Sequence, residues 1–324
     1  MALARAGRLV VTSAFSRDQV MRRHQIGSKP FSRLPCTLDD TLLSVEPARN
    51  GRHEYPLSEE RVVLTVARMD SSEQYKGHDV VLRALPSVVA RVPNLIYMIA
   101  GGGDDRCRLE ALARELGVTH HVVFAGEISD SELSALYQRS EIFVLPARTV
   151  LDVSNPKGEG FGIVFLEAMA FGKPVIGPNR GAPVEIIRDG ENGLLVDPED
   201  PTSVANALVK LLNEPETARK MGQAGRKTVQ TRYSYGMFRG ELRRILAESS
   251  QGATRLQVSH SGENDDTTAA TIISNLQRNS EVSDAKTIWQ LLFLLWLIAV
   301  NVLYYLQFRD LLVSRVPRFL NLWR

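Results

Sequence analysis

The sequence predicts an α/β fold in which a parallel, doubly wound sheet occupies about residues 60–250. Short runs of β-branched and apolar residues alternate there with segments whose apolar residues recur at helical spacing. The strand-like runs are apolar throughout, which is typical of a sheet covered by helices on both faces. The composition, 44% hydrophobic and 23% charged, is that of a globular protein. It excludes a disordered, collagen-like or disulfide-scaffold chain.

The predicted elements alternate strictly along the chain. We expect strands at 61–67, 94–103, 121–126, 141–146, 173–177 and 193–196, and helices at 76–92, 106–117, 129–139, 161–171, 183–188 and within 200–249. Ser129 or Asp130 is expected to cap the helix that ends near Arg139. A Rossmann-like sheet of this kind binds ligands beyond the carboxyl ends of its strands, so chemistry is sought in the loops there.

The charge balance and the cysteines exclude several classes of function. The net charge of +2, from 39 basic and 37 acidic residues, is too small to indicate a nucleic-acid partner. Cys36 and Cys107 lie far apart without metal-type spacing, so we expect reduced thiols and no zinc site. Each of the six histidines is expected to be packed or solvent-exposed.

A transmembrane helix is predicted at residues 287–308. This segment contains no charged side chain and is long enough to cross a hydrocarbon core of about 30 Å. Trp289 and Tyr304 lie near its ends, and Lys286 and Arg309 flank it, as at membrane interfaces. The alternative is a buried core or interface helix.

The segments around this span are polar. Residues 251–286 are poor in aromatics and rich in Ser, Thr, Asn and Asp, which predicts a flexible linker. Residues 309–324 form a basic amphipathic tail that suits contact with anionic headgroups, although a solvated tail is the alternative.

The sequence gives two conflicting indications of topology. Residues 1–23 contain no export signal, so an anchor near the C-terminus would insert after synthesis and leave the globular part in the cytoplasm. By contrast, Arg278 and Lys286 precede the span whereas four arginines follow it, which favours a cytoplasmic tail. We favour the first, because the chemistry indicated below needs cytosolic substrates.

Three of the loops that follow strands carry candidate binding residues. Arg68 and Lys76-Gly77 lie after the first strand and just before a helix, where they suit a diphosphate; surface salt bridges are the alternative. Gly101-Gly102-Gly103 allows the backbone to approach a ligand closely, although it is a weak signal. Gly126 to Ile128 is a turn that could contact a flat base or serve only as a turn.

The fourth loop, NPKGEGFGIVFLEAMAFG at 155–172, is the most specific. Gly160 and Gly162 open a helix and free the backbone to present the N–H groups of Phe161, Gly162 and Ile163 to a phosphate or sugar oxygen. Glu167, one and a half turns on, would accept hydrogen bonds from paired ribose hydroxyls. The alternatives are an exposed helix residue for Glu167 and an N-terminal cap for Glu159.

These residues resemble a known family. The segments EGFGIVFLEAMAFGKPVIG and GAPVEIIRDGENGLLVDPEDP, with Arg68 and Lys76-Gly77 upstream, are similar to the retaining family 4 (group 1) glycosyltransferases of the GT-B fold, over about residues 60–250. Residues 51–250 would then be the C-terminal, nucleotide-sugar-binding half of that fold. The inserted Ser71-Ser72-Glu73 departs from the spacing between Arg68 and Lys76 in many members.

The resemblance implies roles for the candidate residues. The catalytic set is Glu159, Arg68 and Lys76, in which Arg68 and Lys76 hold the diphosphate and Glu159 contacts the sugar. Glu167 binds the ribose. The donor-binding set comprises Gly101, Gly126, Ile128, Phe161, Gly162, Ile163 and Glu167. Such enzymes need neither metal nor cofactor, and the leaving phosphate is thought to help deprotonate the acceptor, so no lone general base is assigned.

The resemblance also sets an expectation for residues 1–50. They match the last strand and helix of the family's N-terminal domain, followed by the interdomain linker, whereas the acceptor pocket and the histidine that commonly supports catalysis are absent. We therefore expect the helix around 233–246 to have lost its docking surface. A UDP- or GDP-type nucleotide should bind, but the sugar should be transferred poorly or not at all.

Two functions of different class follow. The first is a hexosyltransferase that uses a nucleotide-sugar donor and an unknown glycan or lipid-linked acceptor. Its N-terminal domain would either be carried by a partner chain or be missing from this sequence. The second is a non-catalytic, membrane-anchored nucleotide-sugar-binding or scaffold subunit. A flavodoxin-like signalling domain is disfavoured because the strand ends show no acidic phosphorylation pocket.

Overall fold

The structure is a computed structural model that describes residues 8–24, 29–38, 40–45, 59–151 and 156–258. The chain divides into two compact units, Met1–Thr254 and Arg255–Arg324. The sheet and the candidate site belong to the first unit.

A six-stranded, fully parallel sheet forms the centre of this unit. Its strands are β3 (Arg61–Val66), β4 (Leu95–Ala100), β5 (Val122–Gly126), β6 (Ile142–Val144), β7 (Val175–Pro178) and β8 (Gly193–Val196). They lie in the order β5-β4-β3-β6-β7-β8, with Val63 beside both Tyr97 and Ile142. The chain therefore winds outward from β3 in one direction and from β6 in the other, which confirms the doubly wound prediction.

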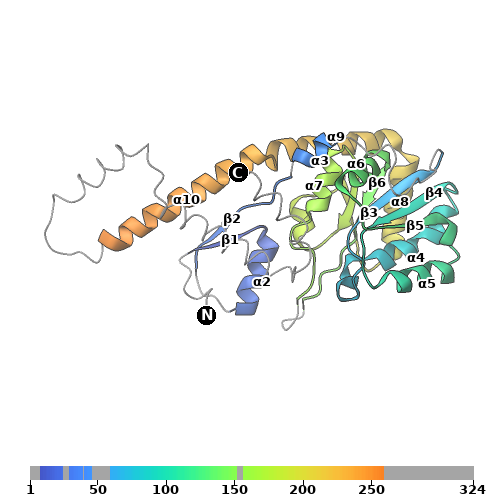
Figure 1. Ribbon diagram of the computed structural model, residues 1–324, viewed down its shortest axis with the longest axis horizontal. Coiled ribbons are helices and arrows are strands. Elements are labelled where there is room, and N and C mark those ends of the chain that lie inside the picture. Colours follow the sequence, from blue (N-terminus) through green and yellow to red (C-terminus); the bar gives the residue numbers. More distant parts are fainter. Residues whose placement is uncertain (1–7, 25–28, 39, 46–58, 152–155, 259–324) are drawn as a thin grey trace, which may run out of the picture. The chain divides into compact units, whose positions relative to one another are not determined.

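Helices cover both faces of the sheet (Figure 1). One buried cluster joins α4 (His78–Val89), α5 (Arg106–Glu115) and α8 (Pro201–Asn213) to Val63. The other joins α6 (Asp130–Arg139), α7 (Ile163–Ala170) and α9 (Pro215–Arg232) to Val62 and Leu64. Because successive strand residues point to opposite faces, neighbours in β3 serve different clusters. This explains why the strands are apolar throughout.

Two predicted helices differ from the observed ones. The helix expected at 161–171 begins only at Ile163, because Gly162 holds a left-handed φ of 97° and acts as its N-cap. The helix expected at 183–188 is the 3₁₀ turn η3 (Ala182–Glu185), with Pro183 near its start. Of the two cap candidates for α6, Ser129 is correct: its hydroxyl accepts from the Glu132 N–H in a capping box.

A small βαβ segment precedes the sheet. Strand β1 (Leu9–Val11), helix α2 (Ala14–His24) and strand β2 (Phe31–Arg33) follow one another, and β1 pairs in parallel with β2. The short helix α3 (Asp40–Ser44) comes next. One strand and one helix were expected within residues 1–50. The structure contains both, as β1 and α2, and also contains β2.

The helix that was expected to have lost its docking surface makes a contact with the N-terminal residues beyond the expected range 233–246. In α10 (Tyr235–Val258), Glu248 forms an ion pair with Arg8, whose Nη1 lies 2.7 Å from Glu248 Oε2. The same Nη1 donates to Ser32 Oγ at 2.8 Å, so α10 contacts the βαβ segment directly. Large apolar side chains of α10 nevertheless stay exposed, among them Tyr235, Met237 and Leu246.

The C-terminal predictions are only partly within the described residues. Helix α10 continues to Val258, so the first residues of the predicted linker at 251–286 are helical. Within the described ranges, no helix is long and apolar enough to cross a membrane. The predicted span at 287–308 and the tail at 309–324 lie outside those ranges.

Candidate functional site

The candidate site lies where the winding of the sheet reverses, between β3 and β6. The loops after these two strands pack against each other: the Arg148 N–H donates to the Tyr75 carbonyl at 2.6 Å. A Cβ on Gly77, whose φ is 82°, would lie 2.3 Å from the Pro146 carbonyl oxygen. Glycine is therefore required where the loop leads into α4. Ligands of doubly wound sheets bind at this switch point.

The loop after β3 delivers Lys76 to Glu159. Residues Ser71–Lys76 form the 3₁₀ helix η1, and Asp70 caps it by accepting from the Ser72 N–H. The inserted residues are accommodated in this helix, which brings Lys76 Nζ to 2.8 Å from Glu159 Oε2. Each side chain of the pair is only 16% exposed. Thus two residues predicted to act together do meet.

The side chains around Lys76 keep it protonated. Burial acts to lower its pKa, but the carboxylate of Glu159, helped by Tyr75 and Glu73, outweighs burial and raises the pKa above its ordinary value. The Lys76 side chain therefore stays positively charged throughout the physiological pH range.

Arg68 lies in a second ion pair. Its Nη2 is 2.6 Å from Glu73 Oε1, and the Glu73 side chain is 16% exposed. Both predicted diphosphate-binding cations thus have carboxylate partners from the loops of the switch point. The salt-bridge alternative describes the observed arrangement of Arg68 and Lys76, although the pairs are partly buried rather than on the surface.

The glycine-rich loop after β4 contacts the end of β5 on one side and the residues that follow β3 on the other. The Gly101 N–H donates to the Gly126 carbonyl at 2.8 Å, which joins two predicted donor-binding positions. Gly101 has a φ of 141°, and a Cβ there would lie 2.1 Å from the Ala67 carbonyl oxygen, next to Arg68. Ile128 is half-buried in the turn that leads into α6 and packs against the core cluster of that face.

Glu167 is held by a buried tyrosine of the neighbouring helix. The hydroxyl of Tyr137, in α6, donates to Glu167 Oε2 at 2.8 Å. Burial first, and the charge of Glu167 second, raise the pKa of Tyr137 well above its ordinary value. Glu167 is half-buried, so its alternative interpretation as an exposed helix residue is wrong.

Replacing Tyr137 by phenylalanine should lower the free energy of unfolding by about 1–3 kcal/mol, because Glu167 then loses a hydrogen bond in a half-buried position. Urea denaturation measures this change. Tyr235→Phe, at a 52% exposed position, is the matched control and should leave stability unchanged. Equal midpoints for Tyr137→Phe and the wild type would show that the bond contributes nothing.

The three predicted amide positions at the start of α7 differ in exposure. Phe161 is 7% exposed, whereas Ile163 is 40% exposed. Since Gly162 is the N-cap, the alternative that Glu159 caps this helix is wrong. The N–H groups of Phe161, Gly162 and Ile163 donate to no acceptor among the described residues.

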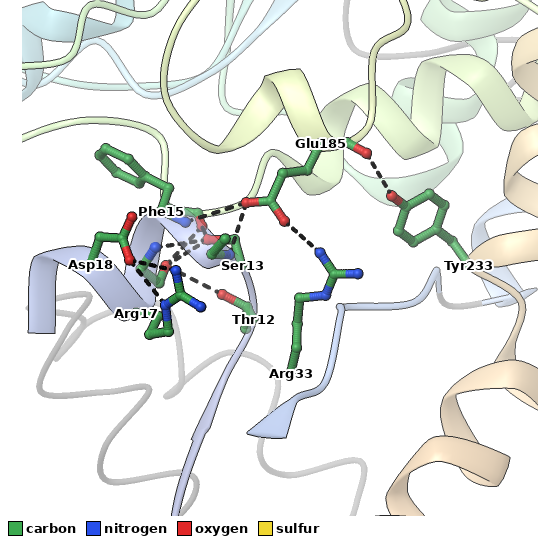
Figure 2. Close-up of polar contacts among 11 residues, drawn as sticks. Thr12, Ser13, Phe15, Arg17, Asp18, Arg33, Glu185 and Tyr233 are labelled. Carbon is green, nitrogen blue, oxygen red and sulfur yellow. Dashed lines mark hydrogen bonds and ion pairs between the residues drawn. The ribbon is translucent and has the colours of Figure 1, made fainter. Parts of the chain in front are cut away.

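A polar cluster beside this loop was missed by sequence reasoning (Figure 2). Glu185 Oε1 accepts from the N–H groups of Ala14 at 2.8 Å and Phe15 at 3.3 Å, and Oε2 accepts from Arg33 at 3.0 Å. The Tyr233 hydroxyl donates to the Glu185 carbonyl at 3.2 Å. Glu185 lies within the GAPVEIIRDG segment that carries the resemblance, which was the available signal.

The remaining predictions on histidines, cysteines and metal ligands concern residues that belong to neither ion pair. His78 is packed, as one of its expected alternatives stated, and burial lowers its pKa to about 4. Cys36 and Cys107 are unpaired, as expected, and burial raises the pKa of Cys36 to about 11. Among the described residues, no group of three His, Cys, Asp or Glu side chains is placed to hold a metal ion.

The sheet order and the charged switch point define an α/β domain built to bind a ligand at its strand ends. The family model for glycosyl transferases group 1 matches residues 50–228, and the chain belongs to this family.

Curated relatives agree with this family. The GDP-mannose-dependent alpha-(1-6)-phosphatidylinositol monomannoside mannosyltransferase of Mycolicibacterium smegmatis is 37% identical over 204 residues, 61% of this chain and 51% of the relative. The protein of the same name from Mycobacterium tuberculosis is 35% identical over 218 residues, 66% of this chain and 54% of the relative. The chain thus spans about half the length of the curated relatives it matches.

Solved structures share the fold. Sucrose-phosphate synthase from Thermosynechococcus elongatus superposes with a TM-score of 0.62 at 29% identity, covering 76% of this chain and 60% of that one. A glycosyltransferase from Rickettsia africae gives a TM-score of 0.61 at 22% identity, covering 75% and 63%, and supports the fold alone.

Proposed function

We propose that the protein is a retaining hexosyltransferase whose described domain binds a nucleotide-sugar donor at the switch point between β3 and β6. The observation that carries this proposal is the partly buried Lys76–Glu159 pair. Two opposite charges held together at the ligand-binding edge of this fold form a site where an anionic phosphate and a hydroxyl-bearing sugar can each find a partner.

Each proposed role follows from charge. Lys76 and Arg68 would bind the diphosphate and stabilise the negative charge that develops on it as the sugar leaves. In the ligand-free chain their positive charges are balanced by Glu159 and Glu73. Binding the diphosphate would let Lys76 exchange this partner and release Glu159 to accept hydrogen bonds from sugar hydroxyls.

The rest of the donor would extend along the sheet edge. The amides of Phe161, Gly162 and Ile163 would bind the sugar, and the carboxylate of Glu167 would accept from the ribose hydroxyls. Gly101, Gly126 and Ile128 would border the base, because the loop after β4 adjoins the end of β3 on one side and Gly126 on the other. We propose no metal in this reaction, so EDTA should leave transfer unchanged.

The relatives suggest the substrates. Their names specify GDP-mannose and a phosphatidylinositol monomannoside. We propose donor and acceptor of these classes for this protein, with transfer supported by a partner chain that supplies the acceptor half.

Transfer can be tested with radiolabelled GDP-mannose and phosphatidylinositol monomannoside, the linkage of the product being read by NMR. We expect label in the lipid fraction, in α linkage, when the acceptor half is supplied. Binding of donor without transfer under every condition would instead support the alternative, a non-catalytic donor-binding or scaffold subunit. Inversion of configuration would contradict the retaining mechanism.

We also propose that residues 287–308 anchor the protein in a membrane, with the globular domain facing the cytoplasm. The uncharged length of this segment supports the anchor. Membranes carrying the full chain should retain it after carbonate extraction at high pH. Release of the intact protein into the supernatant would defeat the spanning helix.

A further inference from the structure

The N-terminus of α2 lies directly on the loop that joins Glu159 to α7. The hydroxyl oxygens of Ser13 and Ser16 lie 2.8 Å and 3.0 Å from the Gly160 carbonyl oxygen. Ser13 is fully buried, and its Oγ also accepts from the Ser16 N–H at 3.0 Å, which makes it the N-cap of α2. Two hydroxyls from one helix thus converge on a single carbonyl of the candidate donor loop.

Holding this carbonyl also fixes the direction of the next N–H group. The peptide between Gly160 and Phe161 is trans and planar, so the Phe161 N–H points away from the Gly160 carbonyl, and thus away from α2. Glycine at 160 places few limits of its own on the orientation of this peptide, so contacts with neighbouring groups decide it. The serine hydroxyls provide these contacts.

A second set of contacts holds α2 in place relative to the loop. Glu185 caps the first two N–H groups of the helix, where the helix dipole favours a carboxylate, and also pairs with Arg33 (Figure 2). Tyr233 donates to the Glu185 carbonyl, and its ring meets that of Phe161 edge to face at 6.0 Å. The loop residue after Gly160 is therefore tied to the same cluster through its side chain.

We propose that Ser13 and Ser16 are positioning residues for the donor sugar, although they belong to the βαβ segment that precedes the sheet. They orient the Gly160–Phe161 peptide so that its N–H faces the sugar, and Glu185 keeps α2 in place to do so. This inference rests on the proposed function and adds to it a contribution from the N-terminal segment to donor recognition.

The test compares two ligands by calorimetry on the full chain, GDP and GDP-mannose. The first variant, Ser16→Ala, removes one hydroxyl and keeps the N-cap residue Ser13. The second is the double variant Ser13→Ala/Ser16→Ala. The third, Ser16→Thr, keeps a hydroxyl at position 16. Ser87→Ala is the matched control, because the exposed Ser87 makes the same kind of bond, to the Ala84 carbonyl at 3.1 Å, in α4. The double variant should bind GDP-mannose about fivefold to tenfold more weakly than the wild type, while its affinity for GDP stays within about twofold.

The outcomes separate this inference from the function beneath it. A selective loss for GDP-mannose in the double variant, absent in Ser16→Thr and in Ser87→Ala, is the expected result. Unchanged affinities in the double variant, or an equal loss for both ligands, would overturn the positioning role while the donor site stands. A wild-type chain that binds neither ligand would overturn the proposed donor and this inference with it.

Discussion

Replacing Lys76 by alanine should weaken the binding of a nucleoside diphosphate by about 1.5–3 kcal/mol, the contribution of a hydrogen bond to a charged group. The expected loss is large because Lys76 is held in position, 2.8 Å from Glu159, and is kept charged by its neighbours. Calorimetric titration with GDP and UDP measures the loss.

The control for this experiment is Lys210→Ala, which removes an exposed lysine near the end of α8. It should bind nucleotide as the wild type does. The Lys76→Ala protein also loses the cation that balances Glu159, so circular dichroism must show that its fold is intact. A folded Lys76→Ala protein with wild-type affinity would count against any role for this lysine in binding the diphosphate.

Replacing Gly101 by alanine should destabilise the fold by about 3 kcal/mol or more, since the strain of a φ at which side chains are disfavoured adds to a steric clash. At a φ of 141°, the new Cβ would lie 2.1 Å from the Ala67 carbonyl oxygen, which belongs to the backbone and cannot move without displacing β3. Urea denaturation measures the change.

Gly117→Ala separates the two causes. Gly117 has a φ of 69° with nothing within 4 Å of its Cβ position, so only the conformational cost of about 1–2 kcal/mol applies. Gly101→Ala should therefore be clearly less stable than Gly117→Ala. If the two variants unfold at the same denaturant concentration, the close approach of the loop after β4 to the end of β3 does not constrain the site.

The sheet could be predicted from the sequence because each strand is marked locally. Apolar runs such as 61–67 are flanked by segments of helical period, and the observed strand differs from this range by a single residue. The late start of α7 is less visible, because it depends on the conformation that Gly162 adopts.

The contacts that make the site are long-range and could not be read locally. Lys76 and Glu159 are 83 residues apart, and Ala14 and Glu185 are 171 apart. The resemblance placed Lys76 and Glu159 on a common ligand but gave no reason for them to pair with each other. Ser13 carries the local mark of an N-cap, whereas its contact with Gly160 depends on how α2 docks.

The docking of α10 shows the same limit. The expectation that this helix lacks a surface to bind was drawn from the length of the segment preceding the sheet. The pair between Arg8 and Glu248 joins residues 240 positions apart, so no local pattern predicts this contact.

Calorimetric titration of the full chain with GDP and with UDP tests the central claim most directly. If the switch point between β3 and β6 is a nucleotide-sugar donor site, one of the two nucleotides binds with a stoichiometry of about one per chain, and Lys76→Ala weakens that binding by the margin given above. A folded chain that shows no heat of binding with either nucleotide would contradict the assignment of the site.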